Sequence, residues 1–399
     1  MNEPNPADES EARESRRPPP PLPLTVITGF LGAGKTTLLN RLLQDPALAD
    51  TLVIINEFGE IGLDHLLVEQ SGDGMLVMTS GCLCCSIRGD LIATLEDVLR
   101  RRDNGRITPF RRVIIETTGL ADPAPVLHTI MYHPYLMLRF RLDGVVTLVD
   151  AVNGAATLDA HEEAVKQAAM ADRIVITKTD LLSGDPGARA LRDLRARLSR
   201  LNPSARILDA AQGEAPASAL LDAGLYDPER KTLNVRGWLN AESFEPQDAP
   251  HDHAGESGHH HAHARAHPDV NRHDARIRAF CMRSGTPIEP AAFDLFLELL
   301  RNAHGPSLLR VKGIIALADD PARPVVIHGV QHVFHPPARM AAWPDDDHAT
   351  RIVFILRDME PAFVDGLWKA FTGAPAVDRP DAAALGRNPL APAAGGLLT

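Results

Sequence analysis

The sequence predicts an α/β protein with a doubly wound, mostly parallel sheet, followed by a smaller α+β domain. Three observations carry this prediction. Short apolar runs alternate with helical patterns from Leu24 to about residue 200, a glycine-rich loop follows the first run, and the composition changes near residue 246. With 399 residues and 44% hydrophobic content, the chain is long enough for two domains with substantial cores.

A glycine-rich loop follows the first predicted strand, Leu24 to Thr28, and precedes a helical pattern. Its spacing, Gly-x4-Gly-Lys-Thr, is typical of the phosphate-binding loop of a P-loop NTPase. Glycines let successive N–H groups point at phosphate oxygens, and the helix that follows adds the positive end of its dipole. A chance glycine-rich turn is the alternative, which the matched strand and helix disfavour. The nucleotide-binding candidates in this loop are Gly29, Gly32, Gly34, Lys35, Thr36 and Thr37.

Four residues are the candidates for catalysis. Lys35 is expected to reach the β- and γ-phosphates, and the Thr36 hydroxyl is expected to hold Mg²⁺. Glu116-Thr-Thr-Gly119 follows the predicted strand Arg112 to Ile115. This position is expected to set the Glu116 carboxylate beside the Mg²⁺ and the Gly119 N–H near the γ-phosphate, as in a sensor of hydrolysis.

The loop after the predicted strand Leu52 to Ile55 supplies two further candidates. Asn56 to Asp64 has the glycines of a mobile loop, and Glu57 and Asp64 are candidate Mg²⁺ ligands or water-positioning groups. A solvated acidic loop fits this composition equally well.

A candidate motif for reading the nucleotide base stands at the end of the predicted strand Arg173 to Thr177. The Asp180 carboxylate can accept from both the ring N–H and the exocyclic amine of guanine, and the stem of Lys178 can pack along the base plane. Thr177 stands where Asn is usual in such a motif and offers one hydroxyl in place of an amide. The sequence therefore favours GTP over ATP, with an ordinary surface turn as the alternative.

The other elements of the first domain follow the same alternation. Gly144 to Val149 is a further apolar run of the kind buried on both faces of a sheet. Helical patterns lie near residues 88–102, 123–131, 159–171 and 187–200. In such a fold the ligand binds at the carboxyl ends of the strands.

Three of the four cysteines, Cys82, Cys84 and Cys85, lie within four residues. They can present three thiolates to one soft or borderline cation such as Zn²⁺, Co²⁺ or Cu⁺. Three protein ligands leave one tetrahedral position open, which suits a metal that must be handed on. The alternative is a set of small buried hydrophobic residues. Cys281, alone on a predicted strand, is expected in the core.

The second half of the chain begins with a histidine-rich linker, predicted at residues 246–274. Eight of the 17 histidines lie between His251 and His273, as a loose second metal store or as a solvated linker. An α+β domain is predicted at 275–372, with a strand at 276–283, a helix at 290–302 and strands at 308–316, 325–333 and 351–356. The P-loop domain is predicted at 24–245, and the tails 1–23 and 373–399 are expected to be disordered.

Composition excludes several classes of function. The net charge of -11 opposes binding to nucleic acid or to an anionic membrane. Neither an apolar run long enough to span a bilayer nor the apolar region of a signal peptide is present, so a cytoplasmic protein is expected. Proteins, nucleotides and metal ions are the expected partners.

Taken together, these motifs resemble the CobW-like family of G-protein metallochaperones, relatives of the urease and hydrogenase nickel-insertion GTPases. The resemblance covers about residues 24 to 372 and includes Asn56-Glu-Phe-Gly, Cys82-x-Cys-Cys, the histidine-rich linker and Leu309-Arg-Val-Lys-Gly313. It implies that GTP hydrolysis is coupled to delivery of zinc or cobalt from the cysteine site to a client metalloprotein, whose identity the sequence does not give. The alternative is a metal buffer or sensor whose affinity the nucleotide tunes.

Overall fold

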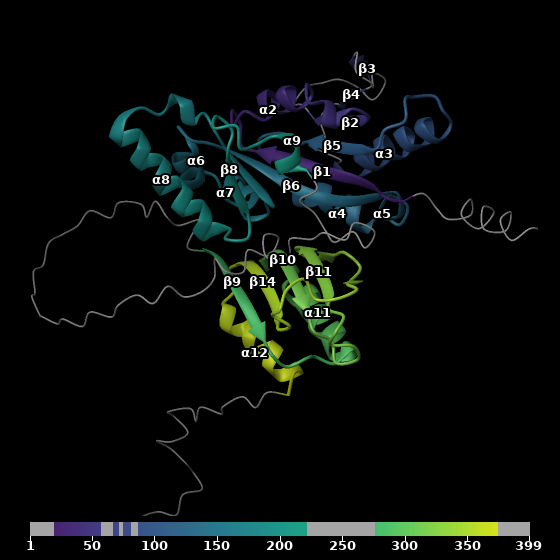
Figure 1. Ribbon diagram of the computed structural model, residues 1–399, viewed down its shortest axis with the longest axis vertical. Coiled ribbons are helices and arrows are strands. Elements are labelled where there is room, and N and C mark those ends of the chain that lie inside the picture. Colours follow the sequence, from purple (N-terminus) through teal and green to yellow (C-terminus); the bar gives the residue numbers. More distant parts are fainter. Residues whose placement is uncertain (1–19, 57–66, 72–74, 81–86, 222–275, 374–399) are drawn as a thin grey trace, which may run out of the picture.

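The computed structural model describes residues 20–56, 67–71, 75–80, 87–221 and 276–373, which form two sheets with their helices (Figure 1). The larger sheet has eight strands in the order β3-β4-β2-β5-β1-β6-β7-β8. All neighbouring pairs are parallel except β3 with β4. The bounds are β1 Leu22–Gly29, β2 Thr51–Asn56, β3 Leu67–Ser71, β4 Met75–Ser80, β5 Arg112–Glu116, β6 Phe140–Asp150, β7 Arg173–Thr177 and β8 Arg206–Asp209. The predicted doubly wound sheet is confirmed.

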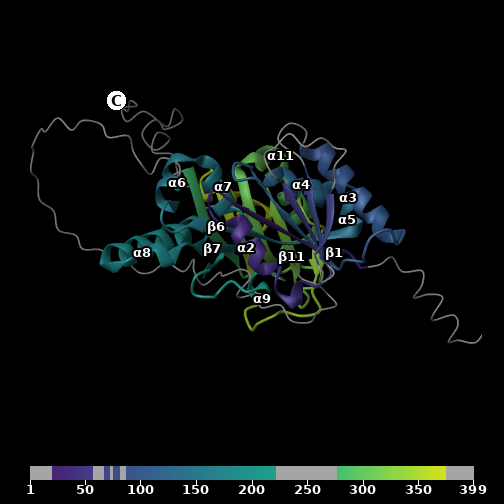
Figure 2. The ribbon, with the colours of Figure 1, turned by 90° about the horizontal axis from the view of Figure 1, so that it is seen from above.

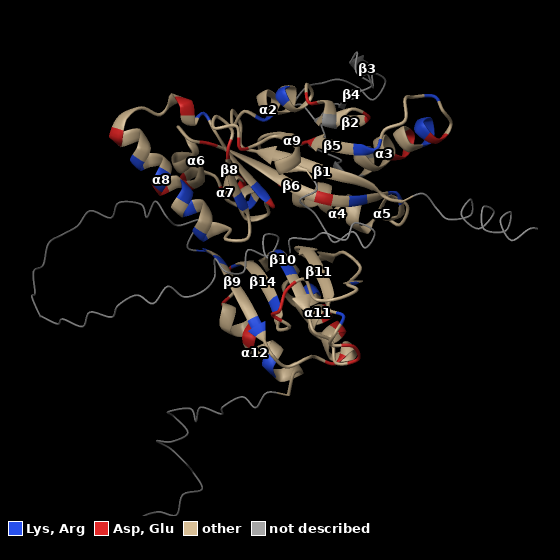
Figure 3. Cartoon of the chain, viewed as in Figure 1, with Lys and Arg blue, Asp and Glu red and all other residues tan. Residues whose placement is uncertain are grey.

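Helices cover both faces of this sheet because the strands are apolar on both sides. Val26 of β1 belongs to the core under α3 and α4, whereas Ile27 belongs to the core under α2 and α9. Seen from above, α3 and α8 lie toward opposite ends of the row of strands (Figure 2). Charged residues of both signs line α8 (Figure 3). The bounds are α2 Lys35–Leu42, α3 Ile87–Asp103, α4 Ala124–Tyr132, α5 Leu136–Arg139, α6 Gly154–Ala160, α7 Glu162–Ala169, α8 Gly184–Leu201 and α9 Ala217–Leu220.

The C-terminal domain is an antiparallel sheet in the order β12-β11-β10-β14-β9, with β13 paired to β11. Its helices α11 and α12 share a core with the sheet that includes Phe293, Phe296 and Trp368. The predicted smaller α+β domain is therefore confirmed. The bounds are β9 Ile277–Ser284, α11 Pro290–His304, β10 Leu308–Ile315, β11 Val325–Val330, β12 Val333–Phe334, β13 Ala338–Arg339, β14 Thr350–Arg357 and α12 Pro361–Phe371.

Three local predictions were wrong. The helix expected near residues 159–171 is present as α7, but it begins only at Glu162, because His161 has extended backbone angles and separates α7 from α6. The strand expected at 325–333 is a hairpin, in which Gln331 has a φ of 52° and Val330 pairs with Val333. Cys281 is half-buried on β9 and not in the core, where its neighbour Met282 lies instead.

Several predictions fall outside the described residues. They concern Glu57, Asp64, the three clustered cysteines and the histidine-rich segment, so the predicted bounds of the domains and tails remain predictions as well. In the part of the chain that the structure describes, no helix is both long and apolar enough to cross a bilayer.

Candidate functional site

The phosphate loop leaves β1 where this strand is packed tightly against β6. Gly29 has a φ of 144°, and a Cβ atom there would come within 2.6 Å of the Leu148 carbonyl oxygen, so no larger residue fits. Gly32 and Gly34 also have positive φ angles, 73° and 90°. Because glycine adopts such angles without steric cost, the loop turns sharply into the first residue of α2, Lys35.

Lys35 and Thr36 lie at the start of α2 and face the loop after β5. The Lys35 ammonium donates to the carbonyl oxygens of Gly29 and Phe30, at 2.9 and 3.2 Å. Burial lowers the pKa of Lys35, and the nearby Glu116 carboxylate partly opposes this shift. The Thr36 hydroxyl donates to Glu116 Oε1 at 3.3 Å. A hydroxyl beside a carboxylate suits Mg²⁺, which prefers oxygen ligands, so the residues present fit this ion.

A cavity of about 420 Å³ lies over these groups. Gly119 reaches it because the loop after β5 touches the tip of the phosphate loop, where a Cβ atom on Gly119 would come within 2.6 Å of the Leu31 nitrogen. The structure therefore brings together all four residues predicted for catalysis. The cavity is lined by Leu31, Gly32, Gly34, Lys35, Thr36, Thr37, Glu116, Thr117, Thr118, Gly119 and Lys178.

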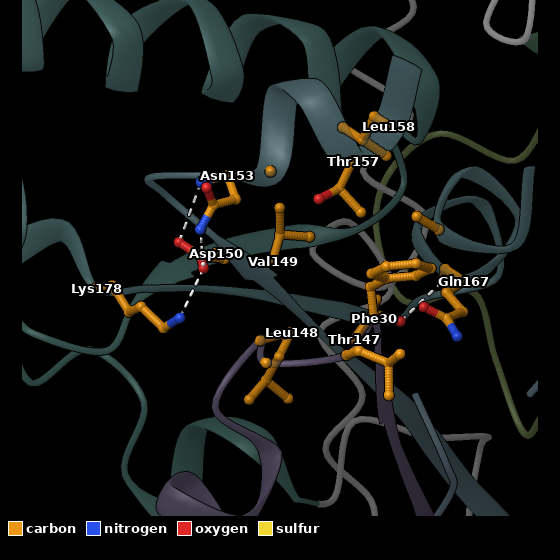
Figure 4. Close-up of a pocket in the computed structure, with 15 residues that line it drawn as sticks. Phe30, Thr147, Leu148, Val149, Asp150, Asn153, Thr157, Leu158, Gln167 and Lys178 are labelled. Carbon is orange, nitrogen blue, oxygen red and sulfur yellow. Dashed lines mark hydrogen bonds and ion pairs between the residues drawn. The ribbon is translucent and has the colours of Figure 1, made fainter. Parts of the chain in front are cut away.

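A second cavity, of about 230 Å³, shares Leu31, Gly32 and Lys178 with the first (Figure 4). Lys178 has a φ of 59° and donates to Asp150 Oδ2 at 2.7 Å. Asp150 also accepts from the backbone N–H of Val152 and from the Asn153 side chain. Burial raises the pKa of Asp150, but the hydrogen bonds from Lys178 and Asn153 outweigh burial and lower it overall. Asp150 thus holds a side chain that lines both cavities.

The remaining residues of the motif that is predicted to read the base make separate contacts. The Thr177 hydroxyl donates to the Ala33 carbonyl at 2.8 Å and so ties β7 to the phosphate loop. Thr179 donates to Asp209 Oδ1 at 2.7 Å, and Asp209 also accepts from the backbone N–H of Ala211 in the loop after β8. Asp180 is exposed in the short 3₁₀ turn Thr179–Leu181 and lines neither cavity.

Sequence reasoning missed Asp150 and Asp209. Each is the last residue of its strand, β6 or β8, and an acidic residue at the carboxyl end of a parallel strand is the signal that marks both.

The metal site predicted at Cys82, Cys84 and Cys85, and the Mg²⁺ candidates Glu57 and Asp64, lie outside the described residues. Among the residues that are described, no group of three or more metal-ligating side chains stands ready to hold an ion. The register of the neighbouring strands nevertheless gives the positions of the described residues that come directly before these segments in the sequence. Asn56 of β2 pairs with Ser80 of β4, and Ile55 pairs with Glu116 of β5. Asn56 and Ser80, the last described residues before these segments, therefore lie at the same edge of the sheet as Glu116.

Known proteins resemble both parts of the chain. The family description "CobW/HypB/UreG, nucleotide-binding domain" matches residues 23–209, and "Cobalamin synthesis protein cobW C-terminal domain" matches residues 277–372. The zinc chaperone YjiA of Escherichia coli is 32% identical over 338 residues, 84% of this chain and 94% of the relative. The zinc chaperone CobW of Sinorhizobium sp is 32% identical over 374 residues, 86% and 95% of the two chains.

A solved structure extends the likeness to three dimensions. The crystal structure of Zn(II)-bound YjiA GTPase from E. coli superposes with a TM-score of 0.64 at 26% identity, covering 88% of this chain and 99% of that one.

Proposed function

The chain belongs to the CobW/HypB/UreG family and is a GTPase, and on that premise we propose that it uses GTP hydrolysis to deliver zinc from Cys82, Cys84 and Cys85 to client metalloproteins. The observation that carries this proposal is the register of the sheet. Asn56 pairs with Ser80 and Ile55 with Glu116, so β4, the last described element before the cysteines in the sequence, ends two strands away from the carboxylate beside Thr36.

Nucleotide chemistry rests on the groups around the larger cavity. Lys35, which donates to its own loop in this structure, would donate to the β- and γ-phosphate oxygens instead. Mg²⁺, held by Thr36 with Glu116 nearby, would neutralise phosphate charge. Gly119 lines the same cavity, and its N–H is the proposed sensor of the γ-phosphate. Glu57 and Asp64 are proposed as Mg²⁺ ligands or as groups that position the attacking water.

Hydrolysis by the isolated chain should be slow. In the described part of the structure, no arginine lines the phosphate cavity. An arginine aimed at the γ-phosphate raises the rate by about 10³ to 10⁵ in related enzymes. A client that supplies such an arginine would therefore also determine when hydrolysis occurs.

The cargo site would hold one Zn²⁺ through three thiolates, with Co²⁺ as a second ion that the same ligands accept. Such a site carries a net charge of about -1 and leaves one coordination position open. An incoming thiolate or imidazole of the client can take this position. Reduced thiols of this kind suit the cytoplasm, where we place the activity. The relatives YjiA and CobW are named zinc chaperones, which favours zinc.

The test is thermodynamic linkage. If GTP changes the affinity for zinc, zinc must change the affinity for GTP by the same factor, typically about 5- to 150-fold. GTP affinity would be measured with and without one equivalent of Zn²⁺ in the parent and in a variant with Ser at positions 82, 84 and 85. Cys281→Ser is the matched control, because this cysteine lies on β9 of the other domain.

The proposal expects a zinc effect in the parent and in Cys281→Ser and none in the triple variant. Equal GTP affinities in all titrations would remove its basis. Zinc binding without any GTP turnover, even with a zinc acceptor present, would favour a nucleotide-tuned buffer.

A further inference from the structure

Gln167 of α7 is a fully buried amide that touches the loop after β5. Its exposed fraction is 0%, and its Nε2 donates to the carbonyl oxygens of Gly119 and Ala121, at 3.2 and 3.0 Å. Two carbonyls accept only from the NH₂ end of an amide, so their positions set the orientation of this side chain. The Gln167 backbone carbonyl accepts from the Thr147 hydroxyl at 2.8 Å, which anchors the helix to β6.

The loop that Gln167 holds is the one that follows Glu116 and faces the phosphate cavity. Within this loop, Gly119 lies so close to Leu31 of the phosphate loop that a Cβ atom on Gly119 would come within 2.6 Å of the Leu31 nitrogen. The loop after β5 is thus held by hydrogen bonds from Gln167 and by its close contact with Leu31. Gln167 lines the second cavity and not the phosphate cavity, so it acts on the nucleotide through the loop.

The same helix has contacts with the phosphate loop and with the C-terminal domain. The Phe30 ring stacks on His161, which directly precedes α7, with 4.4 Å between ring centroids. At the first turn Glu162 pairs with Arg357 of β14 at 2.7 Å. At the last turn Ala169 packs in one cluster with Leu309 and Ile355 of the C-terminal sheet. A shift of the loop after β5 is therefore passed to a helix that the second domain holds at both ends.

We infer that Gln167 is a positioning residue for GTP hydrolysis, which holds residues 117–121 so that the Gly119 N–H faces the γ-phosphate, and which links that loop to the C-terminal domain through α7. The inference rests on the GTPase activity stated above. Loss of the amide donor leaves two loop carbonyls without their partner, so the loop departs from the position that hydrolysis needs.

The experiment compares two buried side-chain amides, Gln167 and Asn202, that both donate to backbone carbonyls. Gln167→Met keeps the approximate volume and removes the donor. Asn202→Leu is the matched control, because Asn202 is also 0% exposed and donates to the carbonyls of Ala168, Ala169 and Ala171 at the C-terminal end of α7, but touches neither the loop after β5 nor either cavity. GTP turnover, the affinities for GDP and for a non-hydrolysable GTP analogue, and Tm are measured for each.

Gln167→Met should lower kcat about tenfold and narrow the difference between the two nucleotide affinities, while the GDP affinity changes by less than about twofold. Asn202→Leu should lower Tm and leave kcat within about twofold. Equal effects of the two variants on kcat would overturn the inference. A parent chain without turnover would overturn the GTPase assignment itself, whereas a hydrolysing parent with an unaffected Gln167→Met overturns only the role of Gln167.

A second measurement needs no variant and decides the matter if Gln167→Met does not fold. Hydrogen exchange of the parent chain with GDP and with the GTP analogue should change at residues 117–121 and 162–169 together, and not at 196–202. A change at 117–121 alone would overturn the inference.

Discussion

Asp172 at the start of β7 and Arg310 of β10 form a buried ion pair that joins the two domains. Arg310 Nη2 lies 2.6 Å from both carboxylate oxygens, and the two side chains are 1% and 0% exposed. Lys312 reaches the same carboxylate at 2.6 Å, and Asp172 also accepts from the Val145 N–H. Burial raises the pKa of Asp172, but the two cations outweigh it and hold this pKa well below its usual range.

Asp172→Asn should destabilise the protein by about 3–5 kcal/mol, because it leaves two buried cations without their counter-charge. Unfolding in urea, followed by tryptophan fluorescence, measures the change. Asp358→Asn is the control, since Asp358 pairs with Arg276 at the surface and should have little effect. Similar losses in both variants would contradict a special role for the buried pair.

Acid should weaken the same interface. Burial and the nearby Arg310 charge lower the pKa of His335 to about 4, and burial lowers that of His328 well below its usual value. Between about pH 6.5 and 4 the unfolded chain takes up protons at these residues and the folded chain does not, so stability falls as the pH falls. His335 alone accounts for roughly 3 kcal/mol. Urea unfolding at pH 7 and at pH 4.5 should show a smaller pH effect in His335→Gln than in the parent; an equal effect would rule His335 out as its source.

Lys35→Ala should abolish nucleotide binding, weakening it by about a hundredfold or more, since the ammonium is the charged donor of the phosphate loop. Titration with a fluorescent GDP analogue measures this loss. Lys369→Ala removes a lysine of an exposed ion pair on α12 and should bind nucleotide like the parent. Retained binding in Lys35→Ala would mean that the cavity over α2 is not the phosphate site.

Base selection should depend on Asp180. Asp180→Asn should lower the affinity for GTP relative to that for xanthosine triphosphate, because an amide cannot accept from both donors of guanine. Competition titrations with GTP, ATP and xanthosine triphosphate give the ratios, and Asp185→Asn, at an exposed site on α8, is the control. Equal affinity of the parent for ATP and GTP would overturn the assignment of guanine.

Deletion of residues 251–273 should reduce the number of weakly bound zinc ions and leave the tight site and GTP turnover nearly unchanged. The expected result follows because the eight histidines of this segment lie outside both predicted cores. Zinc titration with a competing chelator separates the two classes of site. A collapse of tight binding on deletion would make the histidines ligands of the cargo site.

Local patterns predicted those parts of the molecule that local chemistry determines. The phosphate loop needs glycines at positions with positive φ, and Gly32 and Gly34 have such angles. The contact between Thr36 and Glu116 followed from the rule that parallel strands end at one edge.

Long-range partners could not be predicted in the same way. Gln167 lies on the buried face of α7, among Ala164, Val165 and Ala168, and only the folded chain shows that two carbonyls of a distant loop accept from its NH₂ group. Arg310 and Lys312 look like surface residues of a strand until Asp172, more than a hundred residues earlier, meets them. The hairpin at Gln331 was missed because no glycine or asparagine marks its turn.

The contacts between Asp172 and Arg310, Glu162 and Arg357, and His128 and the Val330 carbonyl all join residues that flank the long stretch from Leu221 to Arg276. Continuity of the backbone through that stretch is therefore not what keeps the second sheet seated on the first. A protease that cuts there would leave two fragments that stay together and elute as one species. In this respect the molecule is built like a heterodimer whose two subunits belong to one polypeptide.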